Sequence, residues 1–148
     1  MIRVRKAERK DCVHIYELIK ELALYEKAPD QVTNTVVQLE IDLFDNPICS
    51  AIVAEDKDEI LGFALYYTSY STWKGRCLYL EDFYVKEVHR KKGIGKLLFD
   101  EVVHIAKLQK VKRMDWQVLE WNEPGLEFYR KEKAILDGEW VNGRLFFE

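Results

Sequence analysis

The residues best suited to chemistry in this chain are the adjacent carboxylates Glu81 and Asp82. They interrupt residues 78–85, an aromatic and aliphatic run that is otherwise typical of a buried strand. Burying a carboxylate costs free energy unless the group is paired or used, so two at the centre of such a strand indicate a function. In a cleft, a carboxylate can hold a cation or accept a proton. The alternative is a solvated pair on an edge strand, which the apolar flanking residues disfavour.

A basic glycine loop follows this strand. Its sequence, Arg90-Lys91-Lys92-Gly93-Ile94-Gly95-Lys96, leads into apolar residues at helical spacing as far as residue 108. The first N–H groups of a helix have no intrahelical partner and lie at the positive end of the helix dipole, so such a loop can bind phosphate. The loop matches neither the Rossmann nor the P-loop glycine pattern. Taken alone, it fits a plain helix start equally well, and the neighbouring carboxylates favour a functional site.

The totals predict a single domain over residues 1–148. The net charge of −3 argues against general nucleic-acid binding. Three widely separated cysteines are typical of small buried residues in a reducing compartment, and the three histidines show no metal-ligand spacing, so we expect no metal. No apolar run reaches the roughly 18 residues that span a bilayer, and no segment resembles a signal peptide. A cytoplasmic protein without membrane contact is therefore expected.

Capping and turn signals predict the elements that position these residues. Asp11 caps a first helix and Thr35 with Gln38 caps a second. The expected order is strand 2–5, helices 12–28 and 35–44, strands 49–55, 59–67 and 78–85, helix 94–108, strand 114–119, helix 122–129, and a closing β segment ending at 145–147. This β-α-α-β-β-β-α-β-α-β-β pattern indicates an α/β fold, one mixed sheet with helices on both faces. Strands 78–85 and 114–119 should be parallel neighbours, with a ligand cleft at their carboxyl ends.

Several segments resemble a known superfamily. Residues 90–95 look like the R/Q-x-x-G-x-G/A acetyl-CoA signature of the GNAT N-acetyltransferases, and residues 122–129 resemble its later N-x-x-A-x-x-F-Y segment. Within the superfamily, the chain is most similar to the diamine (spermidine/spermine) and thialysine acetyltransferases. The residues that carry this likeness are 19–23, 25–26, 62–67, Trp73, 78–83 and 120–124. The resemblance covers nearly the whole chain.

The resemblance implies the GNAT fold and transfer of an acetyl group from acetyl-CoA to a primary amine. It implies that the backbone at Phe83 and Val85 pairs with the pantetheine arm, while the loop N–H groups hold the pyrophosphate. Arg90 would add charge-assisted contacts to phosphate. The implied cofactor-binding residues are Phe83, Val85, Arg90, Lys91, Lys92, Gly93, Ile94, Gly95, Lys96 and Asn122.

The reaction makes two demands on the site. An alkyl amine with a pKa of about 10.4 must lose a proton before it attacks, and Glu81 is the expected base, acting directly or through water. The leaving thiolate, whose conjugate thiol ordinarily has a pKa of about 8.5, gains from a proton donor, a role that the resemblance gives to Tyr129. A cationic substrate favours carboxylates and aromatic faces, which Tyr25, Glu26, Trp73 and Asp82 supply.

The chain departs from the family pattern at informative positions. Ser71 stands where polyamine enzymes carry an acidic residue, so a long polycation should lose some affinity, and a short diamine or a lysine analogue such as thialysine fits the site at least as well as spermine. Lys133 replaces a usual glycine, at a cost on the order of 1 kcal/mol if the left-handed conformation is kept. Gly125 replaces a usual alanine, a mild loss of helix propensity.

Other functions and the assembly state remain open at this point. The alternatives are a non-catalytic acyl-CoA-binding or regulatory module, and an enzyme acting on another amine such as a protein N-terminus or lysine. The resemblance implies a homodimer with a shared pocket, to which exposed aromatics such as Trp140 and Phe146 could contribute.

Overall fold

The computed structural model describes residues 1–147, which divide into two compact units. The first is Met1–Gln117 and the second begins at Val118. None of the helices in this described part of the chain is long and apolar enough to cross a membrane.

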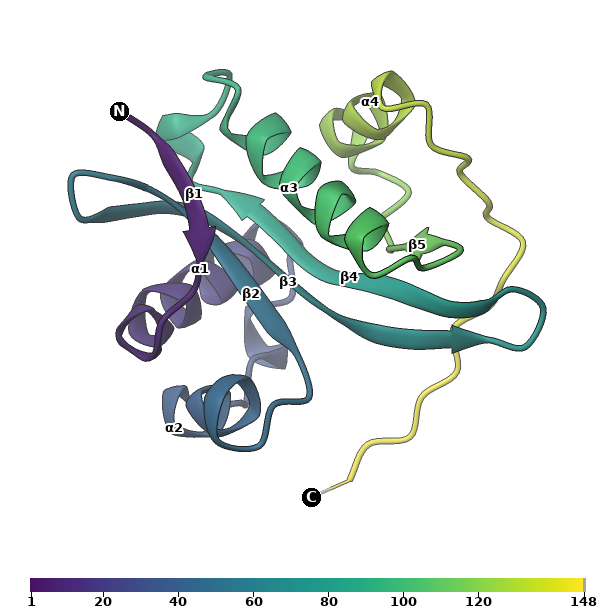
Figure 1. Ribbon diagram of the computed structural model, residues 1–148, viewed down its shortest axis with the longest axis horizontal. Coiled ribbons are helices and arrows are strands. Elements are labelled where there is room, and N and C mark those ends of the chain that lie inside the picture. Colours follow the sequence, from purple (N-terminus) through teal and green to yellow (C-terminus); the bar gives the residue numbers. More distant parts are fainter. Residues whose placement is uncertain (148) are drawn as a thin grey trace. The chain divides into compact units, whose positions relative to one another are not determined.

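The first unit is built on one five-stranded sheet in the order β1-β2-β3-β4-β5 (Figure 1). The strands are β1 (Arg3–Lys6), β2 (Ser50–Asp56), β3 (Glu59–Ser71), β4 (Gly75–Val85) and β5 (Met114–Asp115). Neighbours from β1 to β4 are antiparallel, whereas β5 lies parallel to β4. The mixed sheet and the parallel pairing across the glycine loop and its helix are therefore confirmed.

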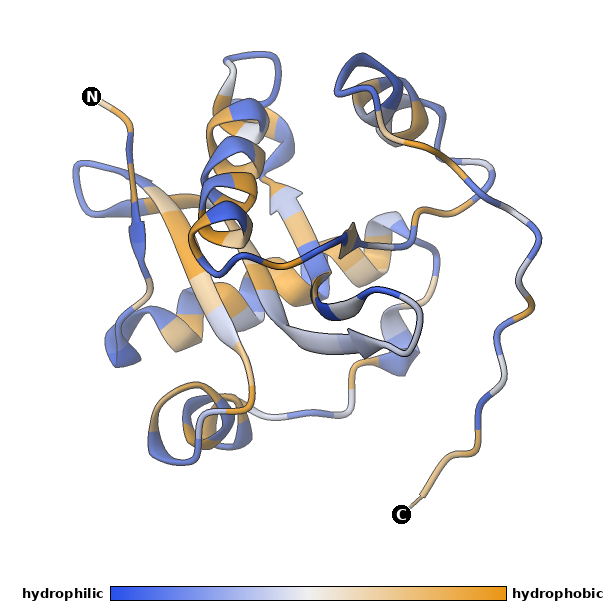
Figure 2. Cartoon of the chain, turned by 45° about the vertical axis from the view of Figure 1, so that its right-hand side comes forward, coloured by the Kyte–Doolittle hydropathy of each residue, from blue (hydrophilic) through white to orange (hydrophobic). Residues whose placement is uncertain are grey.

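Helices cover both faces of this sheet. They are α1 (Cys12–Tyr25), α2 (Val36–Glu40) and α3 (Ile94–Leu108). Helix α2 continues as a π-helical segment over Ile41–Asp45. In Figure 1, α1 and α2 lie on one side of the sheet and α3 on the other. Strands β2 and β3 supply apolar residues to both faces, and Figure 2 shows hydrophobic residues along these strands and alternating with hydrophilic ones around α3. As predicted, Thr35 caps α2 by accepting a hydrogen bond from the Gln38 N–H at 3.1 Å.

The strand predicted over residues 114–119 is much shorter in the structure. Only Met114 and Asp115 pair, with Leu78 and Tyr79 of β4. Residues 116–119 have strand propensity, but propensity yields a strand only where a partner strand is in register. Just beyond Tyr79, β4 bulges at Glu81. The parallel ladder ends before that irregularity.

The second unit contains α4 (Glu123–Lys131) and an extended segment. The Asn122 side chain caps α4 by accepting from the Gly125 N–H at 3.2 Å. Residues 132–147 form no helix or strand, so the two closing strands of the predicted order are not found there. An isolated pair of short strands is marginal in water without a sheet edge to extend, and the Gly-containing turns at 137–138 and 142–143 do not supply one.

Candidate active site

The predicted glycine loop opens α3. Gly93 occupies the N-cap position with φ 79° and ψ 6°, a left-handed conformation that favours glycine. Lys91 is also left-handed, with φ 64°. The Ile94 side chain is buried, so at this position only the backbone N–H can face a ligand. The loop therefore places the first backbone N–H groups and the positive dipole end of a long helix together, an arrangement that suits phosphate.

The end of β4 presents backbone groups on its side away from β3. The Lys86 N–H donates to the Leu61 carbonyl at 2.9 Å, which makes the adjacent Gly62–Val85 pair a non-hydrogen-bonded one. Hydrogen-bonded and non-hydrogen-bonded pairs alternate along an antiparallel ladder, so Phe83 and Ala64 also form a non-hydrogen-bonded pair. The N–H and C=O groups of Phe83 and Val85 therefore point away from β3. In the described chain, β5 does not pair with β4 beyond Tyr79, so no strand of this sheet pairs with that edge of β4 at Phe83 and Val85.

Gly62 permits the close packing of this stretch of β4. A Cβ atom at Gly62 would lie 2.7 Å from the Tyr84 carbonyl oxygen and 3.2 Å from the Val85 Cα. A side chain here would push β3 away from the end of β4. The glycine is needed for the approach of two backbones.

Three carboxylates gather on the α1 side of the sheet. Leu65 pairs with Asp82 and Tyr66 with Leu80, which leaves Glu81 as the extra residue of a β-bulge. Glu81 is exposed, whereas Asp82 is partly buried. Burial, followed by the charges of Glu81 and Glu26, raises the pKa of Asp82 to about 7. Burial and the Glu81 charge likewise raise the pKa of Glu26, at the end of α1. A bound cation would offset the repulsion among these three carboxylates.

Two tyrosines flank these carboxylates. Tyr67 of β3 and Tyr79 of β4 face each other across the ladder and stack with ring centroids 5.3 Å apart. Burial and then the Glu81 charge raise the pKa of both phenols. An aromatic wall beside three carboxylates is an arrangement that suits an alkyl ammonium group.

Arg90, at the start of the glycine loop, packs between two aromatic rings. Its guanidinium carbon lies 5.3 Å from the ring centroid of Tyr25 and 5.2 Å from that of Tyr84. Its Nε–H donates to the Val85 carbonyl at 3.0 Å. The structure thus places Tyr25 against Arg90, although the sequence assigned them to different ligands.

The lysines of the loop lie at the surface. Lys91 and Lys92 are exposed, and Lys92 Nζ lies 3.5 Å from His89 Nδ1. Lys96 Nζ donates to the Asp100 carboxylate at 2.9 Å, a pairing one turn along α3. These three cations lie near the start of α3.

Trp73 stands apart from the carboxylates within one chain. It occupies the β3–β4 turn and is 80% exposed. Ser71 Oγ stabilises this turn by accepting from the N–H groups of Trp73 at 3.2 Å and Lys74 at 3.1 Å. From Gly75, β4 runs to Asp82, roughly 20 Å away at about 3.3 Å per residue. One chain does not bring Trp73 and Asp82 together.

In the second unit, the predicted Tyr129 lies in the last part of α4. It is buried, and its ring meets Phe128 edge to face, with centroids 5.5 Å apart. Gly125 sits tightly against the capping residue, because a Cβ there would be 2.6 Å from Asn122 Nδ2. The unusual glycine thus accompanies a close Asn122 cap.

Comparison with known proteins identifies the family. The acetyltransferase (GNAT) family matches residues 11–133, most of the chain. The chain belongs to this family. It is therefore an acetyl-CoA-dependent N-acetyltransferase, and the predicted fold class is confirmed.

Curated relatives and solved structures are consistent with this. The acetyltransferase is 38% identical over 138 residues to the thialysine N-epsilon-acetyltransferase of Bos taurus, covering 87% of this chain and 81% of the relative. It is 36% identical over 141 residues to spermidine/spermine N(1)-acetyltransferase-like protein 1 of Homo sapiens, covering 90% of this chain and 20% of that longer protein. A ribosomal-protein-alanine N-acetyltransferase from Brucella melitensis shares the fold with a TM-score of 0.74 at 21% identity, covering 99% of this chain and 100% of that one.

Sequence reasoning missed Tyr67, Tyr79, Tyr84 and Glu21 of this acetyltransferase. Tyr84 faces α1, and its hydroxyl donates to Glu21 Oε1 at 3.3 Å. The available signal was strand alternation: Tyr67, Tyr79 and Tyr84 all occupy the α1 face once the bulge at Glu81 is known. Without the bulge, simple alternation puts the residues after it on the wrong face.

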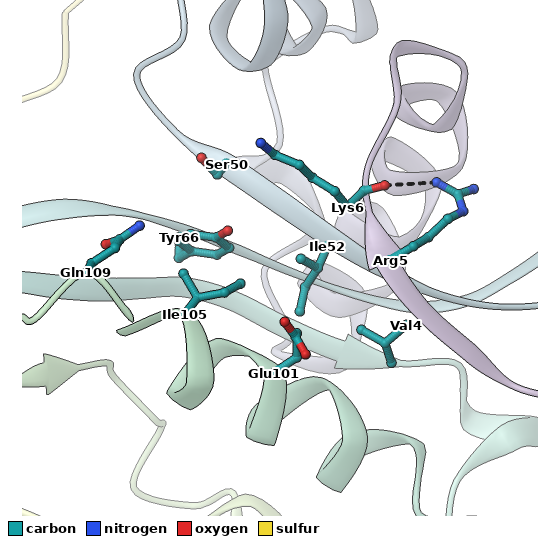
Figure 3. Close-up of a pocket in the computed structure, with 9 residues that line it drawn as sticks. All are labelled: Val4, Arg5, Lys6, Ser50, Ile52, Tyr66, Glu101, Ile105 and Gln109. Carbon is teal, nitrogen blue, oxygen red and sulfur yellow. Dashed lines mark hydrogen bonds between the residues drawn. The ribbon is translucent and has the colours of Figure 1, made fainter. Parts of the chain in front are cut away.

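A hollow of about 400 Å³ lies elsewhere in the acetyltransferase, between α3 and the β1 edge of the sheet (Figure 3). Figure 3 shows Glu101 and Ile105 extending from α3 toward Ile52 and Tyr66 of the sheet. The full lining is Val4, Arg5, Lys6, Ser50, Ile52, Tyr66, Glu101, Ile105 and Gln109. None of the predicted site residues takes part. Residues 1–147 contain no group of three or more His, Cys, Asp or Glu placed to hold a metal ion.

Proposed function

We propose that this acetyltransferase acetylates a primary amine of a small diamine or a lysine analogue such as thialysine. The carboxylate cluster of Glu26, Glu81 and Asp82 is the observation that carries the proposal. Burial and neighbouring carboxylates raise the pKa of Asp82 and Glu26, and such a cluster favours a cationic ligand because its charge offsets the repulsion among the acids. The Bos taurus relative is named for acetylating thialysine, a lysine analogue, which supports a substrate of this kind.

Acetyl-CoA, the acyl donor, supplies the thioester. The fit of the chain to it rests on two features: the β4 backbone groups of Phe83 and Val85 that point away from β3, and the left-handed Gly93 that opens α3. We assign the pantetheine arm to that edge and the pyrophosphate to the N–H groups of residues 91–96. Asn122 is a proposed acetyl-CoA ligand on the likeness of its segment to the family pattern alone.

Glu81 is the proposed base. It is exposed on a bulge, and such irregularities reorient a side chain next to many active sites. From there it can accept the ammonium proton directly or through one water. Asp82 and Glu26, half-buried behind it, would hold the remaining positive charge of the substrate.

Tyr129 is the proposed proton donor to the departing thiolate. Support comes from its place in the family's second segment and from the chemistry of a phenol, which is neutral and able to donate at pH 7. No covalent enzyme intermediate is required, so Cys12, Cys49 and Cys77 have no role in the reaction.

Trp73 is proposed to contact the amine bound to a second copy of the chain. Its distance of roughly 20 Å along β4 from Asp82 favours an intermolecular role over one in its own chain. A homodimer would bring an exposed tryptophan to a partner's carboxylates. Trp140 and Phe146, both strongly exposed, are candidates for the same interface.

A substrate panel tests the proposed function. Purified protein is incubated with acetyl-CoA and with putrescine, spermidine, spermine, lysine or thialysine, and thiol release is followed. We expect the highest kcat/KM with thialysine or putrescine and the lowest with spermine. Turnover only on peptides with a free N-terminus or lysine would contradict the proposal and indicate that the substrate is a protein. CoA binding without turnover on any amine would indicate a non-catalytic module.

A further inference from the structure

Arg90 is already engaged by the protein at several points. Its guanidinium lies between the rings of Tyr25 and Tyr84, and Nε donates to the Val85 carbonyl. The Tyr84 hydroxyl donates to Glu21, and the nearby positive charge of Arg90 partly offsets the rise in the pKa of Tyr84 that burial and Glu21 cause. A guanidinium that stacks on two rings and bonds a carbonyl loses most of its rotational freedom, and a change of partner would cost those contacts.

The carbonyl that Arg90 binds belongs to the edge of β4 that faces away from β3. Val85 forms a non-hydrogen-bonded pair with Gly62, so its carbonyl points away from β3. Arg90 is the first residue of the loop that opens α3, five residues beyond Val85. Its side chain therefore connects the start of the phosphate loop to Val85, the last residue of β4, through a hydrogen bond.

Tyr25 extends this link to α1. It is the last residue of α1, directly before Glu26 of the carboxylate cluster. The Arg90 guanidinium thus joins three elements: the end of α1, the end of β4 and the loop before α3. These are the elements that carry the proposed amine and acyl-donor sites.

We propose that Arg90 is a positioning residue for the acyl donor, acting through the Val85 carbonyl and the Tyr25 ring, and not a phosphate ligand. The proposal rests on the proposed function, because it assigns the pantetheine arm to the β4 edge. Loss of the arginine would let that edge and the loop shift relative to each other. Even a 1 Å misplacement of reacting groups can cost about 10²-fold in rate.

Two acyl donors separate positioning from phosphate binding. S-acetylpantetheine carries the thioester and the arm but no phosphate, whereas acetyl-CoA carries all three. For Arg90→Lys, which keeps the charge but loses the planar stack and the Nε bond, we expect kcat/KM to fall about tenfold with both donors. A loss seen with acetyl-CoA that disappears with S-acetylpantetheine would overturn the proposal and make Arg90 a phosphate ligand.

Binding measured without turnover gives a second readout. By calorimetry, Arg90→Lys should weaken CoA about tenfold, while 3′-phosphoadenosine 5′-diphosphate, which lacks the arm, should bind nearly as in the wild type. Weaker binding of this fragment to the same extent as CoA would contradict the positioning role. Because these titrations need no amine, they remain decisive if the panel of amines shows no turnover and the proposed function itself fails.

The Tyr25 ring supplies an independent variant. Tyr25→Leu should reproduce the pattern of Arg90→Lys with both donors, and Tyr25→Phe, which keeps the ring, should restore most of the loss. The double variant Arg90→Lys, Tyr25→Leu should be little worse than either single one, because both remove the same contact. Arg113→Lys, the same chemical change at an exposed ion pair with Asp115, is the matched control. Fully additive losses would show that the two side chains act separately and would overturn the proposed link.

Discussion

At the scale of single residues, the bulge in β4 separates two neighbouring acids into different environments. Glu81 projects from the bulge into solvent, while Asp82 keeps its place in the ladder opposite Leu65 and is partly buried. The exposed carboxylate can reach a substrate proton, and the partly buried one has a pKa near neutrality. Adjacent acids with different environments are a common basis for assigning separate roles in a site.

The role of Glu81 predicts a specific pH dependence. Glu81→Gln should lower kcat/KM about 10²-fold at pH 7, where the substrate amine is protonated and needs a base. The deficit should shrink as the pH rises toward the amine pKa of about 10.4, because free amine becomes available without the enzyme's help. A pH–rate profile of both proteins measures this. Glu17→Gln, an exposed acid on α1, is the control, and a deficit of constant size at all pH values would assign Glu81 to binding instead.

The raised pKa of Asp82 predicts a stability difference. Its pKa is about 7 in the folded protein against an ordinary value of 3.8, so between these two pH values the folded state binds a proton that the unfolded state has lost. As the pH rises from 3.8 to 7, the folded wild type therefore loses stability relative to Asp82→Asn. The Asn variant should therefore gain Tm over the wild type between pH 4 and 7, by on the order of a few degrees, and hold that gain above pH 7. Thermal unfolding at pH 4 to 9 tests this. Equal Tm values at all pH values would place Asp82 in a solvated setting.

Tyr129 predicts a loss of rate without a loss of donor affinity. Tyr129→Phe removes the phenolic proton and keeps the ring, so kcat should fall about 10²-fold while CoA binding measured by calorimetry stays close to that of the wild type. Phe128→Leu, at the neighbouring ring of the edge-to-face pair, is a control for packing. Weakened CoA binding in Tyr129→Phe would assign the tyrosine a binding or structural role.

At the scale of elements, local signals predicted well what local interactions decide. The Thr35 cap, the Gly93 helix start and the β2–β3 hairpin depend on residues a few positions apart, and the sequence alone identifies them. Features decided by distant partners were not predictable in this way. Asp11 stands at the start of α1 as expected, yet its carboxylate forms an ion pair with Arg5 at 2.8 Å and accepts from the Glu8 N–H. The bulge at Glu81 and the shortness of β5 depend likewise on pairing across the sheet.

The end of α4 predicts a stabilising substitution. Lys133 adopts φ 63°, and the neighbouring Ala134 N–H donates to the Tyr129 carbonyl at 3.0 Å, so the left-handed helix end is kept although lysine replaces glycine. Lys133→Gly should stabilise this end by about 1 kcal/mol, because glycine adopts the left-handed conformation without strain. Thermal unfolding would show a higher Tm. Lys107→Gly, in the right-handed last turn of α3, should instead lower it, and a lower Tm for both would refute the capping argument.

At the scale of the whole molecule, the residues predicted to bind the amine do not all come together in one chain. Glu26, Glu81 and Asp82 gather beside the end of α1, but the aromatic face expected from Trp73 is at the far end of β4. The sequence placed Trp73 in the pocket by resemblance, which carries no information on which copy supplies it. An exposed tryptophan on a long hairpin is an apolar surface that a second chain would bury. A symmetric dimer would then contain two equivalent sites, each made of residues from both chains.

A mixing experiment tests this shared site. Glu81→Gln and Trp73→Ala should each be strongly impaired as homodimers, because every site lacks one residue. If Trp73 acts across the interface, a heterodimer of the two variants has one site with both native residues and one with neither. After unfolding and refolding an equal mixture, about half of the dimers should be heterodimers, so about a quarter of wild-type activity should return. A mixture no more active than the separate variants, or a monomer by light scattering, would place the role of Trp73 within its own chain.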